Sequence, residues 1–170
     1  MLSRTHSATT IALGIHTTKN GKVYNSVVFI KNGTPLGYYQ KRVLVPFTEY
    51  APFGLPIPLA VRFSKGANEQ YFNVGGVKAS ALVCSEIADT NIRMSNTSII
   101  IAPSNDSVFE GEYAAPMHTS MARMRAVEQR AYVLRANKGG SSSIIDPNGT
   151  VLAETLDGVI FATLSLSQKN

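Results

Sequence analysis

The chain has 170 residues, a hydrophobic content of 44% and a charged content of 16%, which exclude a disordered protein and suffice for one domain with a real core. A single cysteine excludes an internal disulfide, and no apolar run approaches the roughly 20 residues of a membrane-spanning helix. The net charge is +5 at pH 7.

This positive charge is unevenly distributed, because the first acidic residue in the chain is Glu49. The basic residues that precede it are spaced singly and form no cluster. We interpret them as solvated side chains at the ends of hairpins rather than as a surface for the phosphates of nucleic acid or lipid headgroups. No nucleic-acid partner is therefore expected.

The first forty residues predict β-structure. Residues 10–16 are apolar, and residues 24–30 are rich in β-branched and aromatic side chains, as is typical of strands. Asn32-Gly33 marks a tight turn, after which residues 35–40 resume the strand pattern. The two runs predict a β-hairpin, with Lys41 just past its second strand.

The next segment predicts a loop. Residues 45–65 contain four prolines and Gly54, and such a density forbids long regular structure. Loops of this length on a protein surface are usually functional or mobile. A short strand is predicted to follow at 70–77.

Two strands in the middle of the chain end in polar residues. The strand predicted at 78–83 carries Cys84 at its carboxyl end, and a short helix is predicted at 88–94. The continuous apolar run 97–102 predicts a strand that is buried on both faces, and it ends at Pro103-Ser104-Asn105-Asp106. We expect the two strand ends to share one rim of a sheet.

The clearest helix signal covers residues 116–136, where Pro116 suits a first helical position. Apolar side chains at helical spacing predict its core-facing stripe: Met117, Met121, Met124, Val127, Ala131 and Leu134. Four charged side chains lie off this stripe: Arg123, Arg125, Glu128 and Arg130.

Three further strands are predicted at 141–145, 150–154 and 158–164. Asp146-Pro147-Asn148-Gly149 has the composition of a turn between the first two. The order of the elements predicts an α/β sandwich with one mixed sheet.

Lys41, Glu49 and Cys84 are the candidate chemical groups. A cysteine nucleophile needs a base for its proton and a group that holds the oxyanion, and a carboxylate and a lysine can do this work. The histidines are His6, His16 and His118. None of them follows a strand in a polar cluster, and their spacing gives no zinc site, so no metal or cofactor is expected. Taken alone, Cys84 could instead be a buried structural cysteine.

Five segments, in order, resemble one family. Residues 39–52 are similar to the lysine motif of the nitrilase (carbon–nitrogen hydrolase) superfamily, and more so to its apolipoprotein N-acyltransferase branch. Leu82-Val83-Cys84-Ser85-Glu86 resembles the nucleophile motif of that branch. Residues 104–109, 121–128 and 136–141 resemble its S-N-D-x-x-F, A-R-M-R-A-x-E and N-x-G segments.

The resemblance implies a nitrilase-like αββα sandwich that is incomplete at its N-terminus, and a ping-pong acyl transfer. Cys84 would take an acyl chain from a phospholipid as a thioester, and the N-terminal amine of a lipidated lipoprotein would accept it. Lys41 would hold the oxyanion together with the backbone N–H after Cys84, while Glu49 would orient the site. The resemblance also implies supporting roles for Ser85, Glu86, Asn105 and Asp106.

The same resemblance implies that the loop at 45–65 helps to form a lipid-facing mouth, here through Phe47, Tyr50, Phe53 and Leu55. A longer parent protein would place the site at the periplasmic face of the bacterial inner membrane, since residues 1–170 themselves predict no transmembrane segment. The alternatives are a soluble carbon–nitrogen hydrolase and a non-catalytic domain derived from the same fold.

The sequence departs from the family in three respects. No Asp or Glu precedes Glu49, although the family carries its general-base glutamate before the lysine. The opening strand–helix–strand portion and the membrane helices of the family are missing, and Ser85 stands where an aromatic residue is usual. We expect residues 1–170 to be a partial carbon–nitrogen hydrolase domain, either a fragment or a short protein, with little acyltransferase activity alone.

Overall fold

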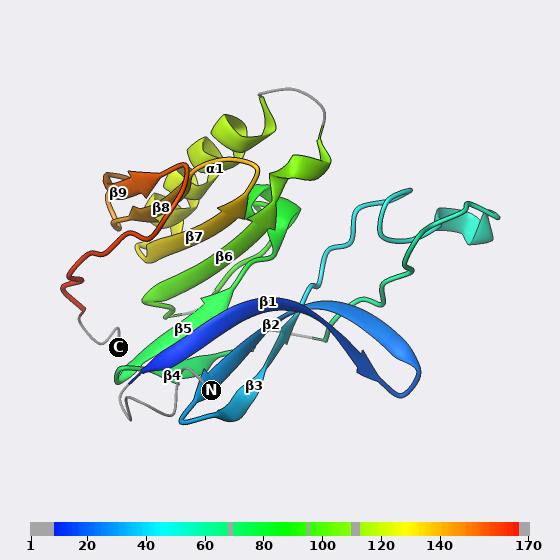
Figure 1. The fold of residues 1–170 in the computed structure, drawn as a ribbon, viewed down its shortest axis with the longest axis horizontal. Helices are drawn as coiled ribbons and strands as arrows, with labels where there is room; N and C mark the ends of the chain where they lie inside the picture. Colours follow the sequence, from blue (N-terminus) through cyan, green and yellow to red (C-terminus); the bar gives the residue numbers. More distant parts are fainter. Residues whose placement is uncertain (1–8, 68–69, 95, 110–112, 167–170) are drawn as a thin grey trace. The chain divides into compact units, whose positions relative to one another are not determined.

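The computed structural model describes residues 9–67, 70–94, 96–109 and 113–166. The chain divides into two compact units, residues 1–69 and residues 70–170. A three-stranded sheet lies in the first unit and a six-stranded sheet in the second (Figure 1). The prediction of one mixed sheet was therefore wrong, because the strands before residue 41 pair only among themselves in the described part of the chain.

The first unit is built on an antiparallel meander of β1 (Thr10–Lys19), β2 (Lys22–Lys31) and β3 (Thr34–Gln40). Both of its turns are two-residue Asn-Gly loops. Asn20 and Gly21 have φ angles of 51° and 72°, and Asn32 and Gly33 have 51° and 75°. Asn and Gly tolerate this left-handed backbone, which matches the twist of the strands. The predicted hairpin is confirmed.

The connection after β3 is irregular, as the prolines predicted. Between residues 41 and 67, the described backbone forms one short 3₁₀ turn, η2 (Pro52–Gly54). Two isolated bridges pin the segment, one between Val23 and Phe63 and one between Pro46 and Tyr50. The loop is thus folded back onto the start of β2.

The second unit is a mixed sheet whose strands follow chain order. They are β4 (Phe72–Val74), β5 (Val77–Ala81), β6 (Ile99–Asn105), β7 (Tyr132–Lys138), β8 (Ser142–Ile145) and β9 (Val151–Thr155). The three central strands β5, β6 and β7 are parallel, and the outer pairs are antiparallel. Parallel neighbours end at the same edge of a sheet, so the predicted shared rim is confirmed.

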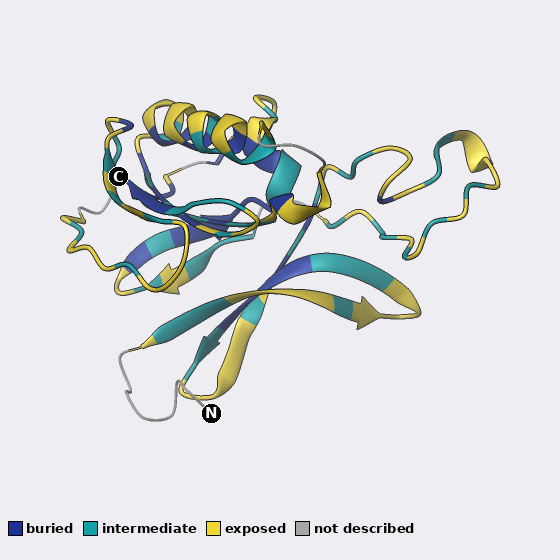
Figure 2. Ribbon diagram, turned by 45° about the horizontal axis from the view of Figure 1, so that its top comes forward, coloured by how far each residue is buried: buried dark blue, intermediate teal, exposed yellow. Residues whose placement is uncertain are grey.

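One helix, α1 (Ala114–Gln129), crosses over between β6 and β7, and two short 3₁₀ turns, η3 (Cys84–Ala88) and η4 (Asp106–Val108), follow β5 and β6. Figure 2 shows that α1 has one buried and one exposed side. The core beneath it consists of Leu82, Ile87, Ile92, Met94, Ile100, Ala102, Ala122, Ala126, Ala131, Val133 and Ile145. No helix among the described residues combines the length and apolar character needed to cross a membrane.

The predicted extent and register of the long helix were wrong. The helix ends at Gln129, Arg130 adopts a left-handed φ of 49°, and the chain then enters β7. Met117, Met124 and Val127 of the predicted stripe are 50%, 62% and 50% exposed. The buried face consists of His118, Ala122, Arg125 and Ala126. Small alanines let the helix approach the sheet, whereas a buried arginine and histidine carry no apolar signal.

Two further predicted elements are absent from the described structure. Residues 88–94 form no α-helix, because Asp89 starts a turn in which its Oδ1 accepts the N–H of Asn91 at 2.9 Å. Residues 158–164 are not in a strand, and their apolar side chains Val159 and Phe161 are exposed. Apolar residues in a short window do not distinguish a strand from an exposed tail when no partner strand is known.

The structure predicts opposite consequences for two apolar residues of similar size. Ile100 lies fully buried under α1, so Ile100→Ala should lower the free energy of unfolding by about 2–5 kcal/mol. Met124 lies on the exposed side of α1, so Met124→Ala should change it by less than about 0.5 kcal/mol. Urea unfolding followed by circular dichroism measures both. Equal losses would show that the methionine stripe faces the core after all.

Candidate functional site

Lys41 and Glu49 form a buried ion pair in the first unit. The Nζ of Lys41 lies 2.6 Å from Oε2 of Glu49, and both residues are buried. A buried ammonium is tolerated only when it is paired and hydrogen-bonded, and Glu49 provides the pairing. The pair carries one fixed positive and one fixed negative charge.

The backbone holds Lys41 in place on two sides. Its N–H donates to the carbonyl of Asn25 on β2 at 2.8 Å, and its carbonyl accepts the N–H of Gly66 at 2.8 Å. A Cβ on Gly66 would lie 2.2 Å from the carbonyl oxygen of Gln40, so only glycine permits this approach. The end of β3 is therefore clamped between β2 and the end of the proline-rich loop.

Glu49 is held as firmly as the lysine. Its Oε2 also accepts the backbone N–H of Val45 at 2.8 Å, and its Oε1 accepts Nδ2 of Asn25 at 3.1 Å. The carbonyl of Glu49 accepts the N–H of Phe63 at 2.9 Å. A carboxylate held by this many donors is well suited to orienting an ammonium.

The apolar side chains predicted to face lipid lie exposed on the proline-rich loop. Phe53 is 97% exposed and Phe47 is 59% exposed, and both have left-handed φ angles, of 56° and 64°. Tyr50 and Leu55 are also exposed. Large aromatic side chains that stay in solvent on a strained backbone are unusual in a loop that only connects two elements.

In the second unit, Cys84 lies three residues past the end of β5 and is partly exposed. It does not face the start of the short α-helix predicted at 88–94, but is itself the first residue of the five-residue turn η3. Its φ angle is 53°, a left-handed conformation that non-glycine residues rarely adopt. A sharp turn at the end of a strand lifts the thiol out of the sheet.

The two neighbours named with Cys84 lie in the same turn. Glu86 is fully buried, and its Oε2 accepts the backbone N–H of Val83 at 2.8 Å. The carboxylate thus folds back onto the residue before Cys84 and fixes the turn. Ser85 lies between them and is partly exposed.

Arg125 of α1 braces the segment that follows Cys84. Its Nη2 donates to the carbonyls of Asp89 at 2.5 Å and Ile87 at 3.4 Å, and its Nη1 donates to the carbonyl of Ile92 at 3.3 Å and to Glu128 at 3.1 Å. Burial lowers the pKa of Arg125, while the charges of Glu128 and Asp89 act to raise it. Sequence reasoning placed Arg125 off the core-facing stripe and missed this role.

The rim after β6 holds a second buried charge cluster. Oδ2 of Asp106 lies 2.5 Å from Nη2 of Arg135, and its Oδ1 lies 2.8 Å from Nδ1 of His118. Ser104 donates its hydroxyl to the same Oδ1 at 2.5 Å. Burial acts to raise the pKa of Asp106, but the hydrogen bonds of Ser104 and His118 and the charges of His118 and Arg135 hold it below its usual value.

This cluster was only partly foreseen. Asp106 was singled out from the sequence, whereas His118 was interpreted as structural or exposed and Arg135 was not considered. Both prove to be buried against Asp106. The signal for Arg135 was a charged residue inside an otherwise apolar strand. Asn105 differs from Asp106 in being exposed, and its Oδ1 accepts the hydroxyl of Ser107 at 2.6 Å.

The structure therefore brings the predicted residues together in two sets. Lys41 and Glu49 are joined in the first unit. Cys84, Ser85 and Glu86 share one turn of the second unit, at the same sheet edge as Asp106.

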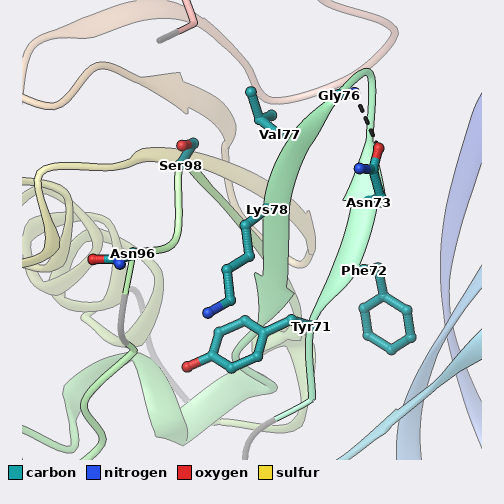
Figure 3. Close-up of a pocket in the computed structure, with 8 residues that line it drawn as sticks. All are labelled: Tyr71, Phe72, Asn73, Gly76, Val77, Lys78, Asn96 and Ser98. Atoms are coloured by element: carbon teal, nitrogen blue, oxygen red, sulfur yellow. Dashed lines mark hydrogen bonds between the residues drawn. The ribbon is translucent and has the colours of Figure 1, made fainter. Parts of the chain in front are cut away.

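A cavity of about 420 Å³ lies elsewhere in the second unit (Figure 3). It is lined by Tyr71, Phe72, Asn73, Gly76, Val77, Lys78, Asn96 and Ser98. The Nζ of Lys78 lies 3.5 Å from the centre of the Tyr71 ring, a cation–π contact. Val77 and Ser98 mark the amino-terminal ends of β5 and β6, so the cavity lies at the opposite edge from Cys84 and Asp106.

The brace by Arg125 can be tested against a matched arginine. Arg125→Lys cannot reach three carbonyls at once, and we expect it to lower the free energy of unfolding by about 1–3 kcal/mol because buried acceptors lose their donors. Arg130→Lys, at an exposed position after α1, should stay within about 0.5 kcal/mol of the parent chain. Urea unfolding measures the free energy of unfolding of both variants. If Arg125→Lys left it unchanged, the bonds from Arg125 to the three carbonyls would not stabilise the fold.

Comparison with known proteins places this site in a family. Residues 1–168 match the carbon–nitrogen hydrolase family. The chain is 32% identical over 139 residues to an apolipoprotein N-acyltransferase of Aquifex aeolicus, covering 77% of this chain and 32% of that protein. It is 35% identical over 164 residues to the one of Allorhizobium ampelinum, covering 86% and 31%. The chain thus spans about a third of the length of these curated relatives.

The solved structures agree with the sequence comparison. A carbon–nitrogen hydrolase superfamily protein of Xanthomonas campestris superposes with a TM-score of 0.67 at 18% identity, over 92% of this chain and 63% of that one. This similarity confirms the predicted nitrilase-like fold class, of which the chain carries part. With the family match over nearly all of its length, the chain belongs to the carbon–nitrogen hydrolase family.

Proposed function

We propose that the chain carries the core of an N-acyltransferase site in which Cys84 is the nucleophile. The acyl donor is a phospholipid, and the acceptor is the N-terminal amine of a lipidated lipoprotein. Two findings support this reaction over others of the family: the names of relatives about 30% identical over most of the chain, and the exposed apolar loop beside the Lys41–Glu49 pair.

In the first step, the thiolate of Cys84 attacks the ester carbonyl of the phospholipid. The new C–S bond pushes the carbonyl electrons onto oxygen, and the tetrahedral oxyanion then collapses and breaks the ester C–O bond. The lysophospholipid leaves as an alkoxide and takes up a proton. In the second step, the amine attacks the thioester, loses a proton, and releases the thiolate of Cys84.

The ammonium of Lys41 is the proposed stabiliser of the oxyanion, together with the backbone N–H that follows Cys84. A fixed cation or N–H donor that is already in place when charge develops contributes a factor of about 10²–10³ to the rate. Glu49 keeps the ammonium oriented, as its three donors and its burial support. The functional pairing of Lys41 with Cys84 rests on the family motif.

The proposal also assigns a place and partners. Phe47, Tyr50, Phe53 and Leu55 would contact the lipid surface from which the donor is drawn, and a longer parent protein would hold the site at the periplasmic face of the bacterial inner membrane. An amidase-type hydrolase would use the same cysteine and lysine with water as acceptor. The exposed aromatic loop favours the lipid-using reaction, since water as acceptor requires no such surface.

Acylation of Cys84 can be followed with an activated ester, which needs no general acid for its leaving group. We expect p-nitrophenyl butyrate to acylate Cys84, and Lys41→Met to slow this step by about 10²-fold because the oxyanion loses its cation. Nitrophenolate release gives the rate, and peptide mass mapping shows whether the acyl group is on the only cysteine.

The matched control is Lys22→Met, at an exposed position on β2. Lys41→Arg keeps the positive charge and covers the case in which Lys41→Met fails to fold. Equal rates for Lys41→Met and Lys22→Met would contradict the assignment. Release of ammonia from simple amides, without transfer to an added amine, would favour the hydrolase.

The loop assignment predicts membrane binding. The double variant Phe53→Ser, Leu55→Ser should weaken flotation with phosphatidylethanolamine–phosphatidylglycerol vesicles by at least tenfold, because burying one large apolar side chain contributes about 1.5–3 kcal/mol. The double variant Val159→Ser, Phe161→Ser removes another exposed apolar pair, from the second unit, and should bind as the parent chain does. Equal losses in both variants would show nonspecific adsorption.

A further inference from the structure

The register of the parallel strands places one arginine on the nucleophile's face of the sheet. Ala81 of β5 pairs with Ile101 of β6, and Ala102 of β6 pairs with Arg135 of β7. Leu82, which follows Ala81, and Ala102 both belong to the core beneath α1. Arg135 therefore lies on the face that α1 covers, at the height of Leu82 and two strands away from it. Cys84 comes two residues later, at the same edge.

The guanidinium of Arg135 is fixed from three directions. Besides Asp106, it donates to the carbonyl of Ser141 at 2.5 Å and to Oγ1 of Thr119 on α1 at 3.2 Å. The residue is buried. A buried cation in one orientation exerts an electrostatic effect on its neighbours that solvent screens only weakly.

The carboxylates around the nucleophile oppose a thiolate. Glu86 lies buried on the turn of Cys84, and Asp106 follows the adjacent strand. His118 on α1 is hydrogen-bonded to Asp106 on the side away from Arg135, and Glu154 on β9 interacts with Arg135. A second negative charge at Cys84 would be unfavourable beside these carboxylates unless a cation compensates it.

Arg135 is electrostatically coupled to both negative groups. Burial lowers its pKa, and the charges of Asp106 and Cys84 act to raise it. Because an interaction between two charges is mutual, the guanidinium of Arg135 attracts a negative charge on the sulfur of Cys84.

We propose that Arg135 is a positioning residue for the nucleophile: its guanidinium, held in place by Asp106 and His118, stabilises the thiolate of Cys84. In this role Cys84 gives its proton to a solvent base, and Arg135 compensates the charge that remains on sulfur. Asp106 has two effects, because it holds Arg135 and also partly neutralises it. The inference rests on the proposed function, in which Cys84 must ionise before it attacks.

The test follows the pH dependence of alkylation of Cys84 by iodoacetamide, monitored by intact mass in the full chain. Arg135→Gln should raise the pH midpoint of alkylation by about one unit and slow the reaction at pH 7 about tenfold, since one unit corresponds to a tenfold change in the thiolate fraction. Arg135→Lys should restore part of the shift. Asp106→Asn, which removes the neutralising carboxylate, should lower the midpoint.

Opposite shifts distinguish this role from a structural one. Loss of packing alone would move Arg135→Gln and Asp106→Asn in the same direction, toward the behaviour of a free thiol, and that result would overturn the inference. So would equal midpoints for Arg135→Gln and the control Arg130→Gln, at an exposed position outside the cluster. If Arg135→Gln does not fold, the pair Arg135→Lys and Asp106→Asn still tests whether the pH midpoint of alkylation shifts in opposite directions.

The outcome is independent of acyl transfer, because alkylation involves neither phospholipid nor amine. Opposite midpoint shifts without any acylation of Cys84 would uphold the inference and refute the proposed function. Acylation of Cys84, together with pH midpoints that do not change when Arg135 is substituted, would uphold the proposed function and refute the inference.

Discussion

Parallel pairing of β5, β6 and β7 is the constraint on which the second unit depends. Because the three strands run in the same direction, every residue that follows them emerges at one edge. Cys84 follows β5, and Asp106 follows β6. The crossover through α1 then covers one face of the sheet and brings Arg125 and His118 to the same edge from above.

Buried charge is the second common theme, and it occurs in both units. Lys41 with Glu49, Arg125 with a row of carbonyls, and Arg135 with Asp106 each satisfy a charge inside the fold. Apolar replacements of similar volume often stabilise a protein as much as such pairs do, so pairs of this kind are weak evidence for stability. Their value here lies in fixed orientation: each holds a backbone segment or a charge in one position.

The sequence predicted the elements whose signals are local. The Asn-Gly turn at 32–33, the proline-rich loop and the Asp146 turn all depend on residues adjacent in the chain, and all were found where expected. The helix register was not predictable in the same way. Alanines at 122 and 126 face the core because they are small, and Arg125 is buried because distant carbonyls accept its protons, which no periodicity reveals.

The candidate site, like the fold, could be predicted from the sequence only in part. The motif resemblance selected Lys41, Glu49, Cys84 and Asp106. Their partners could not be found in this way, since Asn25, His118 and Arg135 reach them only through strand register and the crossover helix. The boundary of β7 was misjudged as helix, and this hid Arg135, because a helical reading gives its side chain a different neighbourhood.

The left-handed backbone at Cys84 has a consequence for the stability of the turn. An L-residue in this conformation costs roughly 1–2 kcal/mol relative to glycine, which adopts it without strain. Exchanging Cys84 for glycine would remove the whole side chain and this strain with it, so the residue that supplies the thiol makes the turn less stable than a glycine would.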